Sequence, residues 1–199
     1  TAFDCVYIAS PNICHAEQTN ALLSAGKHVL CEKPATTDLD SFRIIKQTAL
    51  QSHRVFMEAM RSAYDPAYTV LRNELHRIGT IRRAHFEFCQ YSSRYDQYKN
   101  GTILNAFNPA LGNAAVMDIG VYCIYLMLDL FGKPIHVQSS SILLPNGMEG
   151  TGSVLMQYPN MIGEIVYSKI TDSILPSVFQ GENGSITLTP MEQPQRIMF

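Results

Sequence analysis

Hydrophobic and polar positions at the start of the chain follow the order strand, helix, strand. The apolar runs 3–9 and 28–31 predict two buried strands, and the segment between them predicts a helix with Asn12 as its N-cap that runs to Ala25 and stops at Gly26. A strand, a helix and a strand within about thirty residues form one right-handed crossover of a parallel sheet. This part of the chain is therefore predicted to be α/β.

A second helix and a third strand continue this pattern. Residues 36–38 offer N-caps to a helix that is expected to end near Ser52, because apolar residues such as Ile45 recur on one face. The run 53–60 predicts another strand, and Arg61 follows it. The α/β region is predicted to end at Arg61.

The chain then changes to a helix, a strand and a long irregular segment. Asp65 followed by proline predicts a helix start, and Gly79 closes that helix. The alternation of polar and apolar residues in 81–91 predicts a strand with one buried face. Residues 92–113 lose periodicity. A loop of about twenty residues is either a mobile surface loop or a functional one, and its aromatic and hydrogen-bonding groups favour contact with a polyhydroxylated ligand.

The C-terminal part is predicted to be a helix followed by an open sheet. Residues 114–131 form the most apolar helix, which ends at Gly132 with Pro134 beyond it. Turn residues then separate five segments that we expect to pair consecutively as antiparallel strands, namely 135–144, 152–158, 161–171, 177–180 and 185–188. One uncovered face of such a sheet is a liability, so we expect a second copy to cover it in a homodimer or higher homo-oligomer.

Together these elements predict the fold class α/β plus α+β. Residues 1–61 are expected to form part of a Rossmann-type dinucleotide-binding domain, and residues 62–199 a domain with a large open, mostly antiparallel sheet. A dinucleotide fold needs a Gly-x-Gly-x-x-Gly turn after its first strand, and the sequence contains none. We therefore expect that about the first three strands of this domain are missing from the sequence.

Composition and charge exclude several function classes. The chain has 15 lysine and arginine residues against 17 aspartate and glutamate residues, so nothing points to nucleic acid or an anionic membrane as a partner. No apolar run approaches the about 18 residues of a membrane span. The five cysteines show neither metal-ligand spacing nor the even count of a disulfide framework. We expect a cytoplasmic protein with reduced cysteines and no metal site.

Two polar motifs are candidates for a functional site, one after the second strand and one on the apolar helix. Pro34 cannot donate to a strand ladder, so Glu32 and Lys33 are expected at the carboxyl end of the second strand, where ligands bind in open α/β sheets. In the apolar helix, Asp118 and Tyr122 are four residues apart and share one face. The same face continues to Tyr125 and Asp129. The alternative interpretations are a solvated surface for the first motif and core phenols with satisfied hydroxyls for the second.

These motifs resemble the Gfo/Idh/MocA family of nicotinamide-dependent oxidoreductases, which includes glucose-fructose oxidoreductase, inositol dehydrogenase and dihydrodiol dehydrogenase. The resemblance covers nearly the whole chain, and a tyrosine stands where the family has a histidine or tyrosine. It implies hydride transfer between NAD or NADP and a sugar, polyol or related alcohol or carbonyl substrate. The residues that match the family's cofactor contacts are Ser10, Pro11, Asn12, His15, Glu32, Lys33 and Arg61.

The resemblance assigns the catalytic chemistry to Lys33, Tyr122 and Asp118. Tyr122 would exchange a proton with the substrate oxygen, a role worth about a hundredfold or more in rate. Free tyrosine titrates near ~10, so Lys33 is expected to favour the phenolate and to bond the substrate oxygen. Asp118 would hold a substrate hydroxyl or the lysine, and Glu32 would fix Lys33 or orient the nicotinamide ribose.

Other interpretations stay open at this point. A non-catalytic relative of the same fold could bind a dinucleotide or a sugar as a regulatory signal, although binding alone does not need both Lys33 and Tyr122. The chain could also act only as an assembly module. His15 has a structural alternative, as a residue near a helix N-terminus whose ring is satisfied by the backbone.

Overall fold

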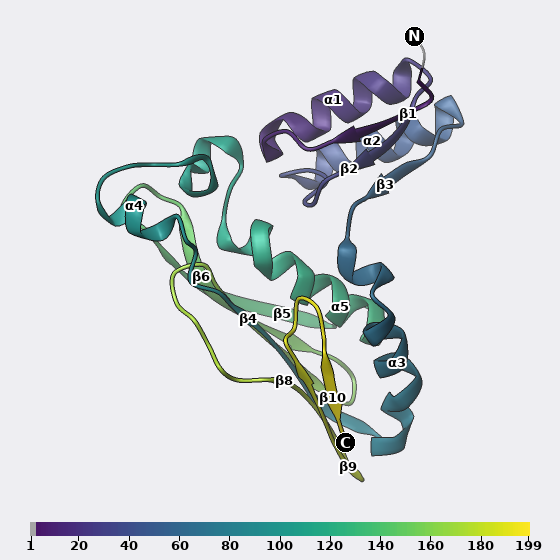
Figure 1. The fold of residues 1–199 in the computed structure, drawn as a ribbon. Helices are drawn as coiled ribbons and strands as arrows, with labels where there is room; N and C mark the ends of the chain where they lie inside the picture. The colour runs from purple at the N-terminus through teal and green to yellow at the C-terminus, as the bar shows by residue number, and fades with distance from the viewer. Residues whose placement is uncertain (1–2) are drawn as a thin grey trace.

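The chain forms two β-sheets joined by a helical segment (Figure 1). In the computed structural model, which describes residues 3–199, a three-stranded sheet comes first and a seven-stranded sheet makes up most of the rest. Figure 1 shows the smaller sheet with its two helices above the larger sheet. The expected order of an α/β region followed by an α+β region is confirmed.

The N-terminal sheet is parallel, as predicted. Its strands are β1 (Cys5–Ile8), β2 (His28–Cys31) and β3 (Phe56–Glu58), connected by the helices α1 (Asn12–Ser24) and α2 (Leu39–Ser52). Its buried core consists of Ile8, Leu23, Val29, Cys31 and Ile45. The polar residues that follow β2 and β3 therefore lie at the carboxyl edge of this sheet.

Two details of this region differ from the sequence prediction. Asn12 is the first residue of α1 and not its N-cap, because its side-chain amide donates to the Gly112 carbonyl (3.1 Å) across the molecule. The third strand is shorter than 53–60, because His53 adopts the left-handed conformation that ends α2 (φ 52°). Both differences arise from backbone and long-range contacts that the local pattern does not contain.

A helical segment links the two sheets. It comprises η1 (Arg61–Tyr64), α3 (Pro66–Glu74) and η2 (Leu75–Ile78). The Asp65 carboxylate accepts a hydrogen bond from the Ala67 backbone (2.9 Å), so it caps α3 as predicted. Gly79 ends the segment at φ +75°, a conformation that favours glycine.

The larger sheet is mixed, which corrects the predicted consecutive meander. Its order is β10-β9-β8-β4-β7-β6-β5, so β4 lies between β7 and β8 and runs parallel to β7. Ala84 and Phe86 of β4 are completely buried, which fits a central strand. The short strand β10 is not predicted by the sequence pattern. The strands are β4 (Ile81–Cys89), β5 (His136–Leu143), β6 (Glu149–Gln157), β7 (Ile162–Ser168), β8 (Ser177–Gly181), β9 (Gly184–Thr189) and β10 (Arg196–Met198).

The irregular segment 92–113 is packed and contains short helices. These are α4 (Tyr95–Lys99), η3 (Asn105–Phe107) and η4 (Pro109–Leu111). The rings of Tyr98 and Phe107 stack at 5.5 Å. Gly112 lies so close to the N-terminal unit that a Cβ atom there would be 2.6 Å from the Thr37 side chain. Of the two alternatives for this segment, a free surface loop does not fit these contacts.

The apolar helix 114–131 is interrupted at its start. Val116–Gly120 forms a π-helical turn, η5, and α5 (Val121–Phe131) follows it. By length and composition alone, Pro109–Phe131 would be long enough to cross a membrane. However, Leu126 and Met127 are completely buried in the core of the larger sheet, which accounts for the apolar composition.

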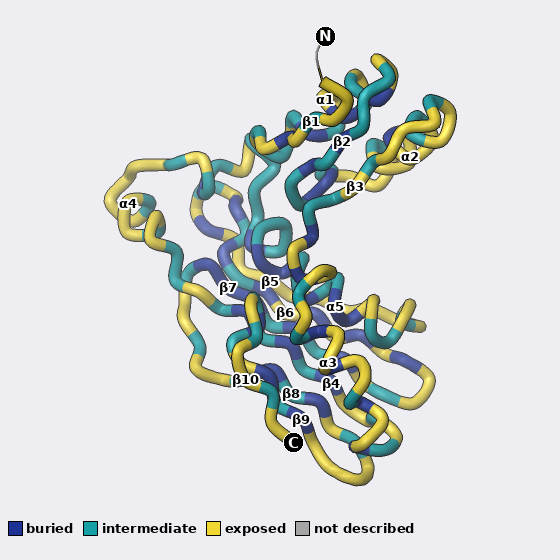
Figure 2. The backbone as a smooth tube through the Cα atoms, turned by 45° about the vertical axis from the view of Figure 1, so that its right-hand side comes forward, coloured by how far each residue is buried: buried dark blue, intermediate teal, exposed yellow. Residues whose placement is uncertain are grey.

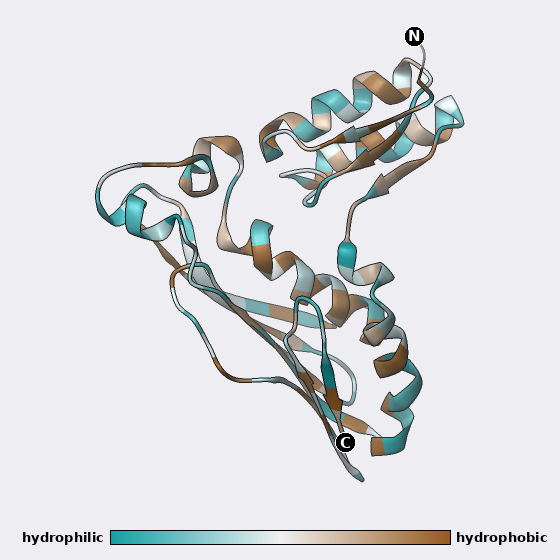
Figure 3. Cartoon of the chain, in the orientation of Figure 1, coloured by the Kyte–Doolittle hydropathy of each residue, from teal (hydrophilic) through white to brown (hydrophobic). Residues whose placement is uncertain are grey.

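Helices α3 and α5 cover one face of the larger sheet. Leu71 of α3 and Leu126 of α5 share a core cluster with Phe86 and Ile165 of the strands. Figure 2 shows buried residues along the central strands, and Figure 3 shows apolar residues along α5. The core of this unit therefore lies between the two helices and the sheet.

Truncation of leucines on α5 tests this packing. Leu126→Ala is expected to lower the free energy of unfolding by about 2–5 kcal/mol, because Leu126 is completely buried. Leu128→Ala makes the same change on the same helix at a side chain that is 41% exposed, and should cost less than about 1 kcal/mol. Urea unfolding measures both values, and equal losses would contradict the described orientation of α5.

Candidate functional site

Residues from the two sheets meet in one ion pair. The Lys33 ammonium, beyond the end of β2, donates to Asp118 Oδ1 (2.9 Å) and to the Asp118 backbone carbonyl (2.6 Å) in the π turn. The Lys33 side chain is only 13% exposed. Both residues are predicted site residues, and the fold brings them together although they are 85 positions apart.

Tyr122 lies beside this pair, on the first turn of α5. The Lys33 ammonium is 5.0 Å from the centre of the Tyr122 ring and lies over its face, which is a cation–π contact. The two other polar residues predicted on this helix face, Tyr125 and Asp129, do not join the Lys33–Asp118 pair. Asp129 pairs instead with Arg72 of α3, and Tyr125 lines neither of the cavities described below.

Contacts from the larger sheet hold the π turn. The Glu149 carboxylate accepts hydrogen bonds from the Val116 backbone (2.8 Å) and from the Tyr167 hydroxyl (2.8 Å). The Tyr167 ring packs on Gly120, where a Cβ atom would lie 3.0 Å from the ring. A glycine at this position therefore lets β7 approach the turn that carries Asp118.

A second lysine, which was not among the predicted site residues, also contacts Asp118. Lys169 follows the last residue of β7, and its ammonium lies 2.8 Å from Asp118 Oδ2. It also donates to the Ala106 carbonyl (2.9 Å). In the sequence, Lys169 directly follows an apolar strand, and Lys33 stands two residues after the end of β2.

Asp118 is therefore a carboxylate between two ammonium groups. Burial raises the pKa of its carboxyl, but the charges of Lys33 and Lys169 and their hydrogen bonds outweigh burial and lower the pKa to about 2. The carboxylate stays ionised at neutral pH and can hold both amines. Its predicted role of holding the lysine agrees with this geometry.

Two adjoining cavities open at these residues. The first, of about 530 Å³, is lined by Glu32, Lys33, Ala59, Arg61, Phe88, Gln90, Asp118, Ile119, Tyr122 and Glu192. The second, of about 260 Å³, shares Gln90, Asp118 and Ile119 with the first and is also lined by residues 91–94 and Lys169. We call them the first and second compartments. Asp118 lies at their boundary.

Besides Lys33, two of the predicted cofactor residues, Glu32 and Arg61, line the first compartment. Glu32 accepts hydrogen bonds from the Tyr7 hydroxyl and from the Lys33 backbone (3.3 Å), so it orders the end of β2 and does not bond the Lys33 amine. Arg61 donates to the Glu192 carbonyl (2.9 Å). Both side chains border the space that a ligand would occupy.

The predicted cofactor residues at the end of β1 are engaged with the protein. Ser10 donates to Gln18 (2.7 Å), Pro11 precedes α1, and Asn12 contacts Gly112. Their contact with a cofactor stays a prediction.

His15 is completely buried, and the structural alternative describes its surroundings. Its two ring nitrogens lie 2.8 Å from the Pro34 and Ser10 carbonyl oxygens, so the ring ties the end of β1 to the turn after Lys33. Any influence of His15 on a cofactor would act through these backbone contacts. Across residues 3–199, no group of three or more His, Cys, Asp or Glu side chains is arranged to hold a metal ion.

Two family models match this chain. The model described as "Oxidoreductase family, NAD-binding Rossmann fold" matches residues 1–60, and the model described as "GFO/IDH/MocA C-terminal domain" matches residues 74–187. The first match covers the smaller sheet, and the second covers the π turn and most of the larger sheet. Lys33 therefore lies in the first match and Asp118, Tyr122 and Lys169 lie in the second, whereas Arg61 and Glu192 lie outside both.

Individual relatives agree with these matches. The chain is 44% identical over 195 residues to the scyllo-inositol 2-dehydrogenase (NADP(+)) IolU of Bacillus subtilis, covering 98% of this chain and 60% of the relative. It is 40% identical over 198 residues to the uncharacterized oxidoreductase YgjR of Escherichia coli, covering 100% of this chain and 60% of the relative. An NAD-binding protein from Listeria innocua shares the fold, with a TM-score of 0.82 at 22% identity over 98% of this chain and 57% of that one. The chain thus spans about 60% of the length of these two curated relatives.

Acid is expected to remove the stabilisation that Asp118 provides. Because its pKa is lowered in the folded chain, the carboxylate stabilises the fold above its unfolded-state pKa near ~4, and this contribution is lost as the pH falls toward about 2. The side chain is 40% exposed, so solvent screening reduces the expected loss to about 1 kcal/mol. Urea unfolding between about pH 4 and pH 2 should show this loss of unfolding free energy in the wild-type chain but not in Asp118→Asn.

Asp129→Asn provides the matched control for this titration. It removes a carboxylate further along the same apolar helix, where Asp129 pairs with Arg72 of α3, and should keep the loss of stability that the wild-type chain shows in acid. The same acid dependence in Asp118→Asn and wild type would contradict the charge cluster.

Proposed function

The chain belongs to the Gfo/Idh/MocA oxidoreductase family, and we propose that it carries the substrate site and part of the cofactor site of an NAD(P)-dependent oxidoreductase. The substrate proposed is a sugar, polyol or related alcohol or carbonyl compound. The observation that carries this proposal is the Lys33 ammonium, which Asp118 holds against Tyr122 at the wall of a cavity. The name of the Bacillus subtilis relative supports a cyclic polyol within this class.

The first compartment fits the nicotinamide end of a dinucleotide. Its wall includes residues at the carboxyl ends of β2 and β3, the edge of a parallel sheet where dinucleotides bind. Glu32, Lys33 and Arg61 would hold the cofactor there, together with residues 10–12 after β1. When bound, NAD or NADP supplies the hydride acceptor or donor.

The residues of this chain supply orientation and proton transfer. An ammonium has three N–H donors, and Asp118 accepts from two of those of Lys33, so one remains for a substrate oxygen. The Tyr122 hydroxyl gives a proton to that oxygen or takes one from it, as the direction of reaction requires. Asp118 keeps the Lys33 amine in position during this exchange.

The second compartment suits the rest of a hydroxyl-rich substrate. Its wall contains Gln90, Asp118 and residues 91–94, which include a tyrosine, two serines and an arginine. Such groups donate and accept hydrogen bonds, as the hydroxyls of a polyol require. This lining supports the substrate-contacting interpretation for the beginning of segment 92–113.

We also propose two domains and a cytoplasmic location for this protein. We place the boundary between the cofactor and substrate domains at Arg61, giving domains 1–61 and 62–199; one family match ends at residue 60 and the next begins at residue 74. The five cysteines are free thiols, which supports a reducing, cytoplasmic location.

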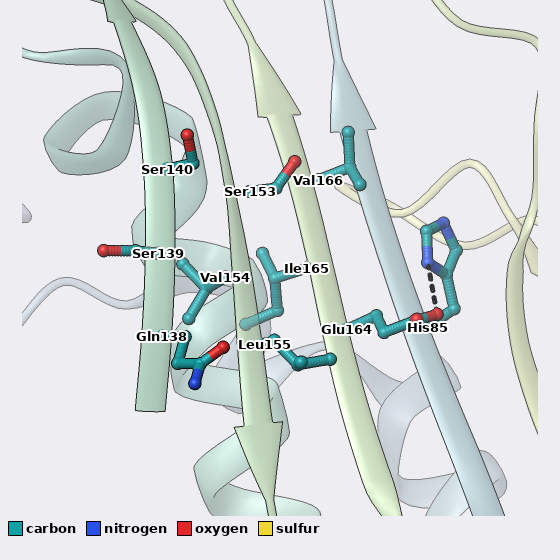
Figure 4. A pocket seen from close by; sticks show the side chains of 10 residues that line it. All are labelled: His85, Gln138, Ser139, Ser140, Ser153, Val154, Leu155, Glu164, Ile165 and Val166. Carbon is teal, nitrogen blue, oxygen red and sulfur yellow. Dashed lines mark ion pairs between the residues drawn. The ribbon is translucent and has the colours of Figure 1, made fainter. Parts of the chain in front are cut away.

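The uncovered face of the larger sheet is proposed to bind a second copy of the chain (Figure 4). It presents the apolar residues Leu155 and Ile162, which are 42% and 48% exposed, next to the polar Gln138. His85 and Glu164 lie across the same face, with side chains 3.8 Å apart. Glu164 also forms an ion pair with Arg83 (2.6 Å), and a face with apolar residues and charges of both signs suits a twofold-symmetric contact.

Removal of the Tyr122 hydroxyl tests the catalytic assignment. In the complete protein, Tyr122→Phe is expected to reduce turnover by about a hundredfold or more and to leave cofactor affinity nearly unchanged, because only the proton-transfer group is lost. Tyr125→Phe makes the same change on the same helix outside both compartments and should keep wild-type turnover. Cofactor absorbance on a panel of sugars and polyols measures the rates.

A regulatory protein of the same fold would give another result. The wild-type protein would then show ligand binding without turnover on the panel, and Tyr122→Phe would leave that binding largely intact. Equal turnover in wild type and Tyr122→Phe would rule out Tyr122 as the proton donor.

Analytical ultracentrifugation tests the sheet-face contact. The complete protein is expected to sediment as a dimer or larger assembly at micromolar concentration, and Leu155→Lys should dissociate it because a buried, unpaired charge is costly. Leu50→Lys on α2, where the side chain is 68% exposed, is the control and should not change the assembly. A wild-type monomer would refute the contact.

A further inference from the structure

Lys169 belongs to none of the motifs that identified the site, yet it is the only buried lysine within residues 3–199, with 4% exposure. Burial of a charged amine is unfavourable unless the amine is paired and hydrogen-bonded. Its ammonium has three neighbours: Asp118 Oδ2 at 2.8 Å, the Ala106 carbonyl at 2.9 Å and the Phe107 ring centre at 5.1 Å. These neighbours hold the ammonium between the Asp118 carboxylate and the segment that contains Ala106 and Phe107.

The two oxygens of Asp118 are divided between two lysines. Oδ1 lies 2.9 Å from Lys33 and Oδ2 lies 2.8 Å from Lys169. Rotation of the carboxylate plane by about a quarter turn about its Cβ–Cγ bond would break both contacts, so Lys169 helps to fix the orientation in which the carboxylate faces Lys33. Lys169 itself does not line the first compartment, where Lys33 and Tyr122 are.

Lys169 also connects Asp118 to the segment that carries Ala106 and Phe107. Phe107 is completely buried, and its carbonyl accepts from the Asn146 side chain (2.8 Å). Further along the same segment, Gly112 accepts from Asn12 of the N-terminal unit (3.1 Å). The position of this segment is therefore linked to Asp118 through one ammonium group.

We propose that Lys169 is a positioning residue that fixes the Asp118 carboxylate against Lys33 and anchors segment 105–113 beside the second compartment. This inference rests on the proposed oxidoreductase function. The other charged residues of the two compartments are Glu32, Arg61, Arg94 and Glu192, and none of them forms an ion pair with Asp118 among the residues that the structure describes. Replacement of Lys169 therefore alters the surroundings of Asp118 while Lys33 remains.

Carboxyl NMR titration and steady-state kinetics of the complete protein test the proposal. In Lys169→Met and Lys169→Gln, the Asp118 carboxyl should titrate at least about one pH unit higher than in wild type, because one of two neighbouring cations is removed. Turnover should fall about tenfold or more with the cofactor KM unchanged, as expected for a misplaced catalytic group. Lys169→Arg retains the charge and should restore the low titration and part of the turnover.

Two further variants keep the test decisive. Lys169→Gln retains a donor for the Ala106 carbonyl, so it provides a folded protein if Lys169→Met does not fold. Lys133→Met, at an exposed lysine beyond α5, is the control and should match wild type. An unchanged Asp118 titration or wild-type turnover in Lys169→Gln would overturn the proposal. An inactive wild-type protein would overturn the proposed function instead, and the titration would still decide the role of Lys169.

Discussion

The ion pairs of one carboxylate determine how the parts of this molecule meet. Lys33 comes from the smaller sheet and Lys169 from the larger one, and both need a counter-charge because neither side chain is more than 13% exposed. Asp118 provides it for both. Since an unpaired buried amine is strongly unfavourable, the arrangement in which both lysines reach this carboxylate is stabilised over alternatives that separate them. The two compartments are the space that remains open around this carboxylate.

The elements that rest on local pattern could be predicted from the sequence. Strand β2 and the buried face of β4 follow from apolar spacing, and helix α1 follows from the residues that bound it, such as Gly26. The insertion of β4 between β7 and β8 could not be predicted in this way, because strand pairing is a long-range choice and the periodicity of a strand does not name its partners. The π turn was missed for a related reason. It shifts the backbone hydrogen bonds of a helix and leaves its apolar composition unchanged.

In the candidate site, too, some residues could be predicted from local sequence patterns and others only from their contacts in the fold. Lys33, Asp118 and Tyr122 were identified because they belong to short motifs, and the structure brings them together. Lys169 stands alone in the sequence, so only its burial and its distance from Asp118 reveal it. Asn12 and His15 show the opposite case. Their positions near a strand end are suitable for ligand contact, but sequence position does not indicate side-chain direction, and both side chains bond the protein.

Gly112 fixes the position of its segment from outside both compartments. It packs against α1 with no space for a side chain, since an added Cβ atom would lie 2.6 Å from Thr37 and 3.3 Å from the Ile13 backbone. It lines neither compartment, yet its segment leads on one side to the Lys169 contacts and on the other to the π turn. A larger residue at this position would have to move the segment away from α1, and with it the Ala106 carbonyl that Lys169 contacts. A position that borders neither compartment can therefore alter the surroundings of Asp118.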